Sequence, residues 1–534
     1  MPMEINLVSC CYEEGNFSYP LGALCIKNAL DHADIPSKLF NYYVSDDPQK
    51  AAQEIHGDIV GLSIYLWNRS WFDLFVKELK SLRPVILFAG GTEVTANPLS
   101  FNLDTYAFLC LGEGEQSIPL ALDSLLSGQK IEGPGLVTKD TTLSYSCPED
   151  LSLLGSVLLD HTADSFLKKS DTVLWELTRG CPFHCAFCFE SKGGRSVRHF
   201  PFERIEAELD YLVRNKIRDV FVLDPTFNID MQRSKKILLL LIKKAKDIHF
   251  TFENRAELLD EELVKLFASL NCSLQIGMQS SNEEVLRNIN RSMDSKKFEA
   301  KVNLLKKEGI VFGLDLIIGL PGDTYVSFCN SLDKAISFQP SNLDIFLLSL
   351  LPGTVLAQKD KEFGLVHQDE SPYLLSESPT MSKQDIARAL SLKRACDLFY
   401  TKGQSCMWMQ TLCQAVDLKA HQVLRLFDSY LSSQKDWESQ DIYQLQSDFV
   451  EKLLTRLGKS QYIAVLCSYI ELYQGIAFLQ ETGENPLIEL NYDPNELAEL
   501  ENESIPCFME THQKRNQTWG IFCNEDGSLY FLEQ

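Results

Sequence analysis

The sequence is poor in the features that place a protein in a membrane or on a nucleic acid. Basic residues are scarce: 50 Lys and Arg stand against 74 Asp and Glu, and the net charge is −24. Such a balance argues against a protein that binds a nucleic-acid backbone, because phosphate contacts need clustered Lys and Arg. No apolar run approaches the roughly 18–20 residues of a membrane-spanning helix. Glu4 also stands where a secretory signal peptide would have basic residues. We therefore expect a cytoplasmic protein with no membrane span and no nucleic-acid partner.

The first part of the chain alternates short apolar runs with helical stretches. The hydrophobic share of 45% over 534 residues is that of a globular protein with several domains. Strands with helices between them indicate βαβ units, so we expect an α/β fold in which residues 1–130 form a doubly wound, Rossmann-like domain. The expected strands are Ile5–Ser9, Ser37–Asn41, Ile59–Tyr65, Val85–Ala89 and Ala107–Leu111. Residues 131–168 lack strong periodicity and are expected to be a linker.

The alternation of strands and helices resumes after the linker. The expected strands are Val173–Leu177, Asp219–Leu223, His249–Phe252, Ser273–Ile276, Phe312–Ile318 and Leu343–Leu348. Six such units predict a partial (β/α)6 barrel of the TIM type over residues 169–365, with its chemistry at the carboxyl ends of the strands. Residues 366–534 are expected to form a mostly helical domain that ends in a hairpin of Trp519–Cys523 and Leu529–Leu532.

Glycine-rich segments follow two of the strands expected in the first domain. In doubly wound sheets ligands bind beyond the carboxyl ends of the strands, and glycine lets the backbone approach a ligand closely. Tight turns without a ligand are the alternative explanation. The residues of these two segments are Gly90, Gly91, Thr92, Glu93, Gly112, Glu113, Gly114 and Glu115.

Three of the 16 cysteines are grouped in one short loop. Most of the others lie among apolar neighbours, where cysteine behaves as a small buried hydrophobe. Cys181, Cys185 and Cys188 have the spacing C-x3-C-x2-C directly after an expected strand. Three thiolates on one loop can hold three irons of a [4Fe–4S] cluster and leave the fourth iron open. A zinc site that adds His184 or His199 is the alternative, although structural zinc usually has four closed ligands.

This loop resembles the cluster loop of radical S-adenosylmethionine (SAM) enzymes. The resemblance covers residues 176–188 and includes the aromatic Phe187 before the last cysteine. It implies that the amino and carboxylate groups of SAM bind the fourth iron. One electron, supplied by a reductant such as flavodoxin or ferredoxin, would then cleave SAM to a 5′-deoxyadenosyl radical. The cofactor does the difficult chemistry, while the protein orients it and excludes water.

The later strands of the expected barrel support the same resemblance. Polar residues stand where the family places its SAM contacts, and a guanidinium such as that of Arg291 suits the SAM carboxylate. One segment departs from the family pattern: Asp224 stands in a run that in many members reads Gly-Gly-Glu. The SAM contacts that the resemblance implies are Phe187, Asp224, Glu253, Gln279, Ser280, Arg291, Asp315 and Ile317.

A doubly wound domain before such a barrel resembles the cobalamin-binding class of radical SAM enzymes, class B. The resemblance covers about residues 1–365 and implies cobalamin at the two glycine-rich segments. The Asp-x-His-x-x-Gly pattern, which supplies a histidine to cobalt in many cobalamin proteins, is absent. Within this class its absence implies cobalt without a histidine ligand, and a domain that has lost its cofactor is the alternative. The C-terminal region resembles an uncharacterised subgroup, which implies no particular substrate.

The resemblance implies methylation of an unactivated carbon in a small-molecule, lipid or peptide substrate. Radical oxidation, cyclisation or rearrangement on the same scaffold is the alternative. A tRNA-modifying role is disfavoured by the acidic charge, and neither Cys10 with Cys11 nor Cys406 with Cys413 has the spacing of a second cluster. A non-enzymatic iron–sulfur sensor or cobalamin chaperone is a further alternative. The SAM-binding pattern argues against it, because a cluster alone needs no SAM site.

Overall fold

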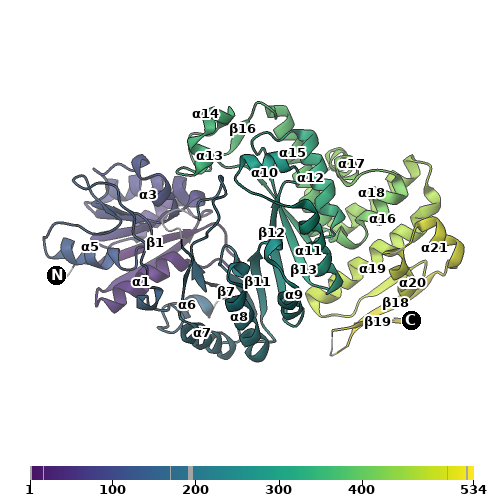
Figure 1. The fold of residues 1–534 in the computed structure, drawn as a ribbon, viewed down its shortest axis with the longest axis horizontal. Helices are drawn as coiled ribbons and strands as arrows, with labels where there is room; N and C mark the ends of the chain where they lie inside the picture. The colour runs from purple at the N-terminus through teal and green to yellow at the C-terminus, as the bar shows by residue number, and fades with distance from the viewer. Residues whose placement is uncertain (1–2, 16, 169, 191–195, 502, 525–526) are drawn as a thin grey trace.

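The computed structural model describes residues 3–15, 17–168, 170–190, 196–501, 503–524 and 527–534. The chain forms three regions in a row, with the N-terminal domain at one end, the barrel in the middle and the C-terminal region at the other end (Figure 1). The barrel and the C-terminal region share one continuous hydrophobic core, whereas the N-terminal sheet has a separate core on each face. The C-terminal region is therefore packed onto the barrel as part of one folded unit.

The N-terminal domain is the expected doubly wound sheet. Its order is β2-β1-β3-β4-β5-β6, and β1 to β5 are parallel. The strands are β1 (Ile5–Cys11), β2 (Ser37–Tyr43), β3 (Ile59–Ser63), β4 (Ile86–Gly90), β5 (Phe108–Cys110) and β6 (Leu136–Val137). The helices are α1 (Leu21–His32), α2 (Pro48–Glu54), α3 (Arg69–Leu82), α4 (Thr92–Ala96) and α5 (Ser117–Leu126). Helices α2 and α3 bury apolar residues on one face of the sheet, and α1 and α5 do so on the other.

The segment expected to be a linker contributes regular structure. Strand β6 pairs antiparallel with β5, and the segment also holds the short helix α6 (Asp164–Leu167). Leu136 and Val137 are both buried, so the strand covers the otherwise open edge of β5 with apolar side chains. A strand of two residues is too short to show a period in the sequence. The segment thus carries short regular elements, and its place as the linker between the two domains stays a prediction.

The central region is a parallel sheet of six strands, in the order β14-β13-β12-β11-β10-β7. This confirms the predicted partial barrel. The strands are β7 (Thr172–Trp175), β10 (Asp219–Val222), β11 (His249–Asn254), β12 (Cys272–Gln279), β13 (Val311–Ile318) and β14 (Asn342–Leu347). The helices are α7 (Phe202–Arg214), α8 (Met231–Lys244), α9 (Glu261–Ala268), α10 (Glu283–Asn288), α11 (Ser295–Lys307), α12 (Tyr325–Ser337), α13 (Val355–Gln358) and α14 (Asp360–Phe363).

Most of these helices begin at a side chain that caps them. A capping oxygen accepts a hydrogen bond from one of the first backbone N–H groups, which have no partner inside the helix. The capping residues are Asp230 for α8, Asp260 for α9, Asn282 for α10, Asp294 for α11 and Thr324 for α12. The caps of α8, α9, α10 and α12 fix where a strand-to-helix turn ends, and Asp294 fixes the start of α11 after α10.

The C-terminal region is mostly helical, as expected, and closes the free edge of the barrel. Its helices are α15 (Lys383–Cys396), α16 (Met409–Val416), α17 (Ala420–Ser433), α18 (Ile442–Arg456), α19 (Ile463–Thr482), α20 (Pro494–Leu497) and α21 (Ile505–Thr511). Its strands are β15 (Val366–His367), β16 (Leu375–Glu377), β17 (Leu487–Leu490), β18 (Gln517–Cys523) and β19 (Leu529–Glu533), and the predicted hairpin is β18–β19. A π-helical turn, Asp397–Lys402, follows α15 beside β14, where the Tyr400 hydroxyl donates to the Pro340 carbonyl at 2.8 Å.

One helix meets the length and composition of a membrane span. The stretch Ser460–Thr482, which contains α19, has 23 residues, and its most apolar window of 18 residues has a mean hydropathy of 1.4. The statement that no apolar stretch approaches such a length is therefore corrected, because scattered polar residues hide this helix from a search for an unbroken apolar run. Half of the window, 50%, is buried inside the structure. The helix packs against α18, β17 and β18. The absence of a membrane span stays a prediction.

Candidate active site at the mouth of the barrel

The loop with the three cysteines starts after β7 at one end of the barrel. It leaves on strand β8 (Thr178–Arg179) and returns on strand β9 (Arg198–His199), which pair with each other, while residues 191–195 lie outside the described part. The backbone of Ala186 is held on both sides: its N–H donates to the Ile289 carbonyl at 2.9 Å, and its carbonyl accepts from the Leu356 N–H at 2.8 Å. The loop is therefore anchored to segments that follow β12 and β14.

Asp224 fixes the start of this loop. Its Oδ1 accepts hydrogen bonds from the backbone N–H groups of Leu177 and Thr178, both at 2.9 Å, and the side chain is buried. Burial raises its pKa to about 6, although these hydrogen bonds lower it. The geometry assigns Asp224 a role in positioning the loop, and the SAM contact expected for it stays a prediction.

The three thiols are not arranged around a single ion. Among the described residues, the group with three candidate ligand atoms within 4.8 Å of one another is Glu499, Glu503 and His512, far along the chain in the C-terminal region. Two sulfurs on one tetrahedral zinc, each at about 2.3 Å, would lie only about 3.8 Å apart. Structural zinc sites usually have four closed ligands, whereas three cysteines suffice for a cluster with one open iron. His184 is exposed.

The end of β12 places two polar side chains with unsatisfied atoms at the barrel mouth. Gln279 has a φ of +66° beside an irregularity in the pairing of β12 with β13. A Cβ on Gly277 would lie 2.4 Å from Gln279 Nε2, so only glycine there lets the carboxamide fold back over the strand. Arg291 donates to the Gly277 carbonyl. Gln279 Oε1 and Arg291 Nε are buried without a hydrogen-bond partner. Because buried polar groups are normally paired, the two orphan atoms fit a polar ligand such as SAM.

Arg291 also lies beside the cluster loop. Burial lowers the pKa of Arg291, and the neighbouring positive charge of Arg255 lowers it further. The Arg291 guanidinium lies close enough to the Cys185 thiol for that side chain to act in the opposite direction and raise the pKa of Arg291. The side chain is 7% exposed. The sequence-predicted pair of Gln279 and Arg291 is thus brought together next to the predicted cluster ligands, as a SAM molecule bound to an open iron would require.

Carboxyl groups line the inside of the barrel just below this level. Gln275 Nε2 donates to Asp315 and, at 2.8 Å, to Asp344 Oδ2, and the last two residues are partners in the register of β13 with β14. Burial raises the pKa of Asp315 to about 6. Burial, followed by the charge of Asp315, raises the pKa of Glu253 to about 7. The Glu253 side chain is exposed to solvent, and its residue is the register partner of Gln275 on β12.

The other predicted SAM contacts differ in how deeply they are buried and in what they contact. Ile317 is buried on β13, two residues beyond Asp315 and on the same inner face. Phe187 is partly buried against the barrel core. Ser280 is buried, and its hydroxyl accepts from the Asn282 N–H at 3.1 Å. Ser280 thus shapes the turn before α10, and its contact with SAM stays a prediction.

The glycine-rich segments of the N-terminal domain meet their own backbone. Gly91 has a φ of +111°, and a Cβ there would lie 2.3 Å from the Ile64 carbonyl oxygen. Gly112 has a φ of +88°, and a Cβ there would lie 2.2 Å from the Ser146 carbonyl oxygen. Tight turns therefore account for these two glycines without any ligand. Thr92 is exposed at the end of β4 and remains free for one.

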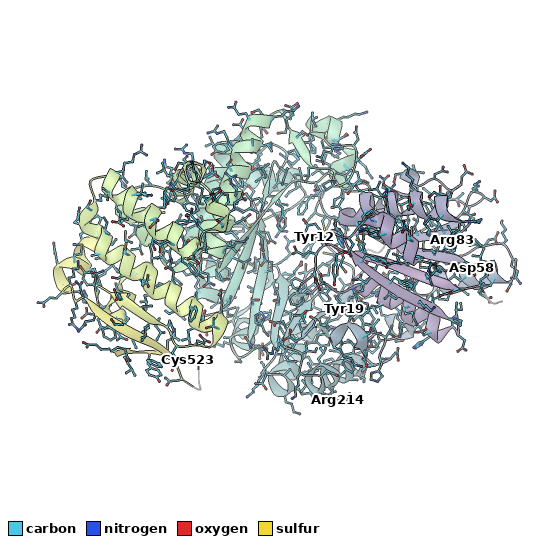
Figure 2. The ribbon with its side chains drawn as sticks, turned by 180° about the vertical axis from the view of Figure 1, so that it is seen from behind. Tyr12, Tyr19, Asp58, Arg83, Arg214 and Cys523 are labelled. Atoms are coloured by element: carbon cyan, nitrogen blue, oxygen red, sulfur yellow. The ribbon has the colours of Figure 1, made fainter. Side chains whose placement is uncertain are left out.

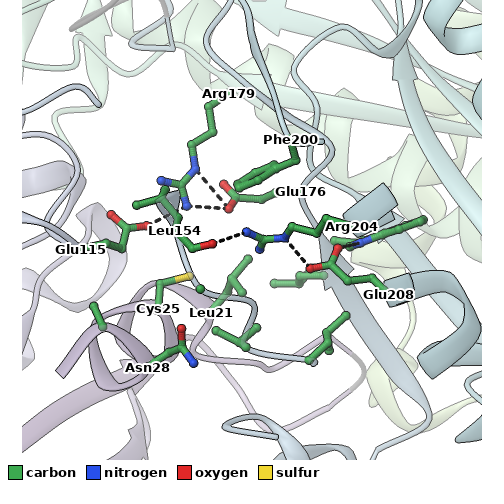
Figure 3. A pocket seen from close by; sticks show the side chains of 16 residues that line it. Leu21, Cys25, Asn28, Glu115, Leu154, Glu176, Arg179, Phe200, Arg204 and Glu208 are labelled. Atoms are coloured by element: carbon green, nitrogen blue, oxygen red, sulfur yellow. Dashed lines mark hydrogen bonds and ion pairs between the residues drawn. The ribbon is translucent and has the colours of Figure 1, made fainter. Parts of the chain in front are cut away.

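The glutamates of these segments bind the barrel region. Glu113 Oε2 pairs with Arg179 at 2.9 Å, and Glu115 pairs with the same guanidinium at 2.8 Å. Arg179 also binds Glu176, so three carboxylates surround one largely buried cation. Figure 3 shows two of them, Glu115 and Glu176, beside the Arg179 guanidinium. The third glutamate, Glu93, accepts a hydrogen bond from Tyr373 in the segment after the barrel. No spacing in the sequence predicted these contacts between domains, and the role of these glutamates toward cobalamin stays a prediction.

Exposed aromatic side chains that sequence reasoning missed lie at the same edge. Tyr65 and Trp67 follow β3 and stack at 4.6 Å with an interplanar angle of 7°. Trp67 is 46% exposed, and Tyr12, which follows β1, is 66% exposed. Figure 2 places Tyr12 on the side of the N-terminal domain that faces the barrel. Exposed aromatic rings such as those of Trp67 and Tyr12 can contact a large apolar ligand.

The central region matches a known family. The model of the Radical SAM superfamily matches residues 175–335. The matched residues run from the end of β7 into α12 and so cover most of the barrel, including the cysteine loop. A [4Fe–4S] cluster and SAM are the cofactors that this family implies, in agreement with the cysteine loop and the Gln279–Arg291 pair.

The chain is also similar to curated proteins that extend beyond this domain. It is 26% identical to the cobalamin-dependent radical SAM methyltransferase TokK of Streptomyces tokunonensis, over 58% of this chain and 50% of TokK. It is 24% identical to the 2-(S-pantetheinyl)-carbapenam-3-carboxylate methyltransferase of Streptantibioticus cattleyicolor, over 63% of this chain and 56% of that protein. The chain thus spans about half the length of these curated relatives.

Two solved structures share the fold. OxsB, a cobalamin-dependent SAM radical enzyme solved with aqua-cobalamin and SAM bound, has a TM-score of 0.58 at 16% identity, over 85% of this chain and 80% of its own. TsrM of Kitasatospora setae, a radical SAM methyltransferase solved with cobalamin and a [4Fe–4S] cluster bound, has a TM-score of 0.57 at 15% identity, over 69% of this chain and 78% of its own. Both likenesses extend beyond the barrel and confirm the predicted α/β architecture.

Proposed function

We propose that this chain is a cobalamin-dependent radical SAM enzyme that methylates an unactivated carbon. The substrate would be a small molecule, a lipid or a peptide. The observation that carries the proposal is the ion pair between Glu113 and Arg179. Arg179 is two residues before Cys181, and Glu113 follows β5. The pair therefore sets the carboxyl edge of the N-terminal sheet against the loop that would hold the cluster.

This arrangement suits two cofactors that act on one substrate. A ligand at the carboxyl edge of the N-terminal sheet would lie beside the barrel mouth, where the Gln279–Arg291 pair would hold SAM. Exposed Trp67 and Tyr12 offer apolar planar surface at that edge, which fits a corrin ring. Bound cobalamin would supply the methyl group, and SAM with the cluster would supply the radical. The missing Asp-x-His-x-x-Gly pattern implies that no histidine of that motif binds the cobalt.

The chain's own residues would orient the two cofactors and exclude water. Arg291 would bind the SAM carboxylate, and Gln279 Oε1 would accept a hydrogen bond from SAM, so that both orphan atoms gain partners. A SAM site formed by Arg291 and Gln279 argues against an iron–sulfur sensor, because a sensor has no need to bind SAM. A one-electron donor such as flavodoxin or ferredoxin would be the protein partner. We propose a cytoplasmic location, with no nucleic-acid partner and no membrane span.

The test is anaerobic purification with cobalamin supplied, followed by a visible spectrum, metal quantitation and product analysis. Methylation consumes two SAM molecules, so we expect S-adenosylhomocysteine and 5′-deoxyadenosine in equal amounts, with about four irons and one cobalt per chain. The control is the triple variant Cys181→Ala, Cys185→Ala and Cys188→Ala, which should keep cobalt and form no 5′-deoxyadenosine. Deoxyadenosine alone would favour oxidation, cyclisation or rearrangement. The absence of deoxyadenosine from loaded wild-type protein would favour a sensor.

A further inference from the structure

Arg255 lies against the cysteine loop and belongs to none of the predicted SAM contacts. It directly follows β11, and its guanidinium carbon is 3.9 Å from the centroid of the Phe183 ring. Phe183 stands between Cys181 and Cys185. The Arg255 side chain is only 12% exposed. A cation over an aromatic face is attracted by the ring quadrupole, and the attraction is stronger where water is excluded. The contact therefore holds the first half of the cysteine loop against the barrel.

The backbone of Arg255 is held in a dedicated clamp. Asn228, which is buried in the loop after β10, accepts from the Arg255 N–H at 3.1 Å and donates to the Arg255 carbonyl at 2.9 Å. One carboxamide thus satisfies both backbone groups of a single residue. The clamp fixes the point from which the guanidinium reaches the loop, so the stack with Phe183 is built into the fold.

The charges around Arg255 leave it weakly compensated. Its ion-pair partner is Glu257 at 3.5 Å, and the other oxygen of that carboxylate, Oε2, is buried without a hydrogen-bond partner. Arg291 is its neighbour on the other side, close enough that the Arg255 charge lowers the pKa of Arg291. Arg291 in turn lies near Cys185, whose side chain raises the pKa of Arg291. Two guanidinium groups therefore stand together on the side of the loop where thiolates and a cluster would place negative charge.

We propose that Arg255 is a positioning residue for the iron–sulfur cluster: it fixes the cysteine loop through Phe183, and its positive charge raises the reduction potential of the cluster. The proposal rests on the cluster that the proposed function requires. When the oxidised [4Fe–4S] cluster accepts one electron from its donor, it gains one negative charge, and a fixed cation nearby stabilises the reduced form. Loss of the charge should make reduction harder, and loss of the stack should loosen the loop.

The experiment compares reconstituted, anaerobic holoenzymes by two measurements that do not depend on turnover. The first is a redox titration against mediators, followed by the electron paramagnetic resonance signal of the reduced cluster. The second is the rate of iron release to a chelator. The variants are Arg255→Met, which removes charge and stack, Arg255→Lys, which keeps the charge, and Phe183→Leu, which keeps the charge and removes the ring. The control is Lys236→Met, which removes an exposed cation–π contact between α7 and α8. In that contact, Lys236 Nζ lies 3.8 Å from the centroid of the Phe202 ring.

For Arg255→Met we expect about a tenfold lower equilibrium constant for reduction, which is about 59 mV for a one-electron couple. Arg255→Lys and Phe183→Leu should keep the wild-type potential and release iron several times faster. Lys236→Met should match the wild type in both measurements. An Arg255→Met protein with the wild-type potential and the wild-type rate of iron release would overturn the proposal. A wild-type protein that retains no cluster at all would overturn the proposed function first, and would be recognised by its iron content. If Arg255→Met does not fold, the contrast between Arg255→Gln and Arg255→Lys carries the same test of the charge.

Discussion

The Tyr373 hydroxyl donates a hydrogen bond to the carboxyl group of Glu93 and thereby joins the segment after the barrel to the first turn after β4. Both side chains are buried, at 5% and 3% exposure, and the Asn97 amide donates to the same hydroxyl at 3.2 Å. Arg69 lies 3.9 Å from the Glu93 carboxylate. Burial raises the pKa of Glu93, although this hydrogen bond lowers it. The contact ties together two regions that lie 280 residues apart in the chain.

The first prediction is that Tyr373→Phe destabilises the protein. The change removes one oxygen and leaves a buried carboxyl group without its donor, which costs about 1–3 kcal/mol. Urea unfolding followed by tryptophan fluorescence would measure the loss. Tyr530→Phe is the matched control, because Tyr530 is 39% exposed on β19, and its change should stay within about 0.5 kcal/mol. Equal stability of the two variants would show that the Glu93 contact contributes nothing.

The second prediction concerns Arg179, the cation shared by three glutamates. Its side chain is 12% exposed and that of Glu115 is 11% exposed. Arg179→Met would leave the partly buried carboxylates of Glu115 and Glu176 without their cation, whereas Glu113 would keep its ion pair with Arg198. Removing one partner of a buried ion pair costs about 3–5 kcal/mol, which is the upper limit here. We expect the variant to unfold at lower urea concentration and to be cleaved by a protease between the N-terminal domain and the barrel.

The control for Arg179 is an exposed ion pair of the same type. Arg218 pairs with Asp171 at 3.4 Å, and their side chains are 79% and 50% exposed. Arg218→Met should change the free energy of unfolding by no more than about 0.5 kcal/mol, because exposed ion pairs contribute little. If Arg179→Met behaved like this control, the charge cluster would not hold the two domains together.

The pattern of strands was predictable because each strand buries a run of apolar residues of its own. Val220 and Val222 of β10 are fully buried, and the runs around them stand out in the sequence. The cysteine loop stands out in the sequence because three cysteines follow one another within eight residues. Gln279 and Arg291 were predictable only through the resemblance to a family, because each is an ordinary polar residue in a loop.

The contacts between distant segments were not predictable from local pattern. Glu113 was expected at a cofactor, yet its carboxylate binds Arg179, 66 residues later. The glycine at position 112 was expected beside a ligand, yet it makes room for the carbonyl of Ser146. Nothing in the sequence near Arg255 indicates Phe183, because only the folded barrel brings the end of β11 to the loop after β7. Pairing across domains is a property of tertiary structure and leaves no periodic signal.

The third prediction is that Gly277→Ala weakens SAM binding and leaves the fold and the cluster intact. The new methyl group would lie 2.4 Å from Gln279 Nε2 and 3.3 Å from Arg291 Nη2. Both atoms are the ends of flexible side chains, so they would move out of place while the backbone keeps its conformation. We expect about a tenfold weaker affinity for SAM, measured by anaerobic calorimetry, with unchanged iron content.

A second variant of the same site and a control variant complete this test. Gln279→Leu removes the orphan oxygen and should weaken SAM binding to a similar degree. Ser273→Ala, near the start of the same strand, should bind SAM as the wild type does. Unchanged affinity in both Gly277→Ala and Gln279→Leu would remove Gln279 from the SAM site.

The fourth prediction is a pH dependence of SAM binding that comes from Glu253. Its pKa is raised to about 7, first by burial and then by the charge of Asp315. The carboxyl group is therefore mostly neutral at pH 6 and mostly charged at pH 7.5, with the charged fraction rising from about one tenth to about three quarters. SAM carries a net positive charge, so the charged carboxylate should bind it better. We expect SAM affinity to rise up to about eightfold between pH 6 and pH 7.5.

Glu253→Gln should remove most of this rise. In that variant a smaller rise of SAM affinity should remain, centred about one pH unit lower, because the pKa of Asp315 is about 6.

The raised pKa of Glu253 also affects the stability of the protein. The folded protein holds the Glu253 proton more tightly than the unfolded chain does, so stability is lost as the pH rises from about 4.5 through about 7. Glu253→Gln should therefore make the apoprotein more stable than the wild type at pH 8, with little difference at pH 4.5. Glu262→Gln, whose side chain is 73% exposed on α9, is the control for both measurements. An affinity of the wild type for SAM that does not change between pH 6 and pH 7.5 would contradict the prediction. Glu253 would then either lie outside the SAM site or titrate at its ordinary pKa. The pH dependence of the stability of Glu253→Gln would distinguish these two explanations.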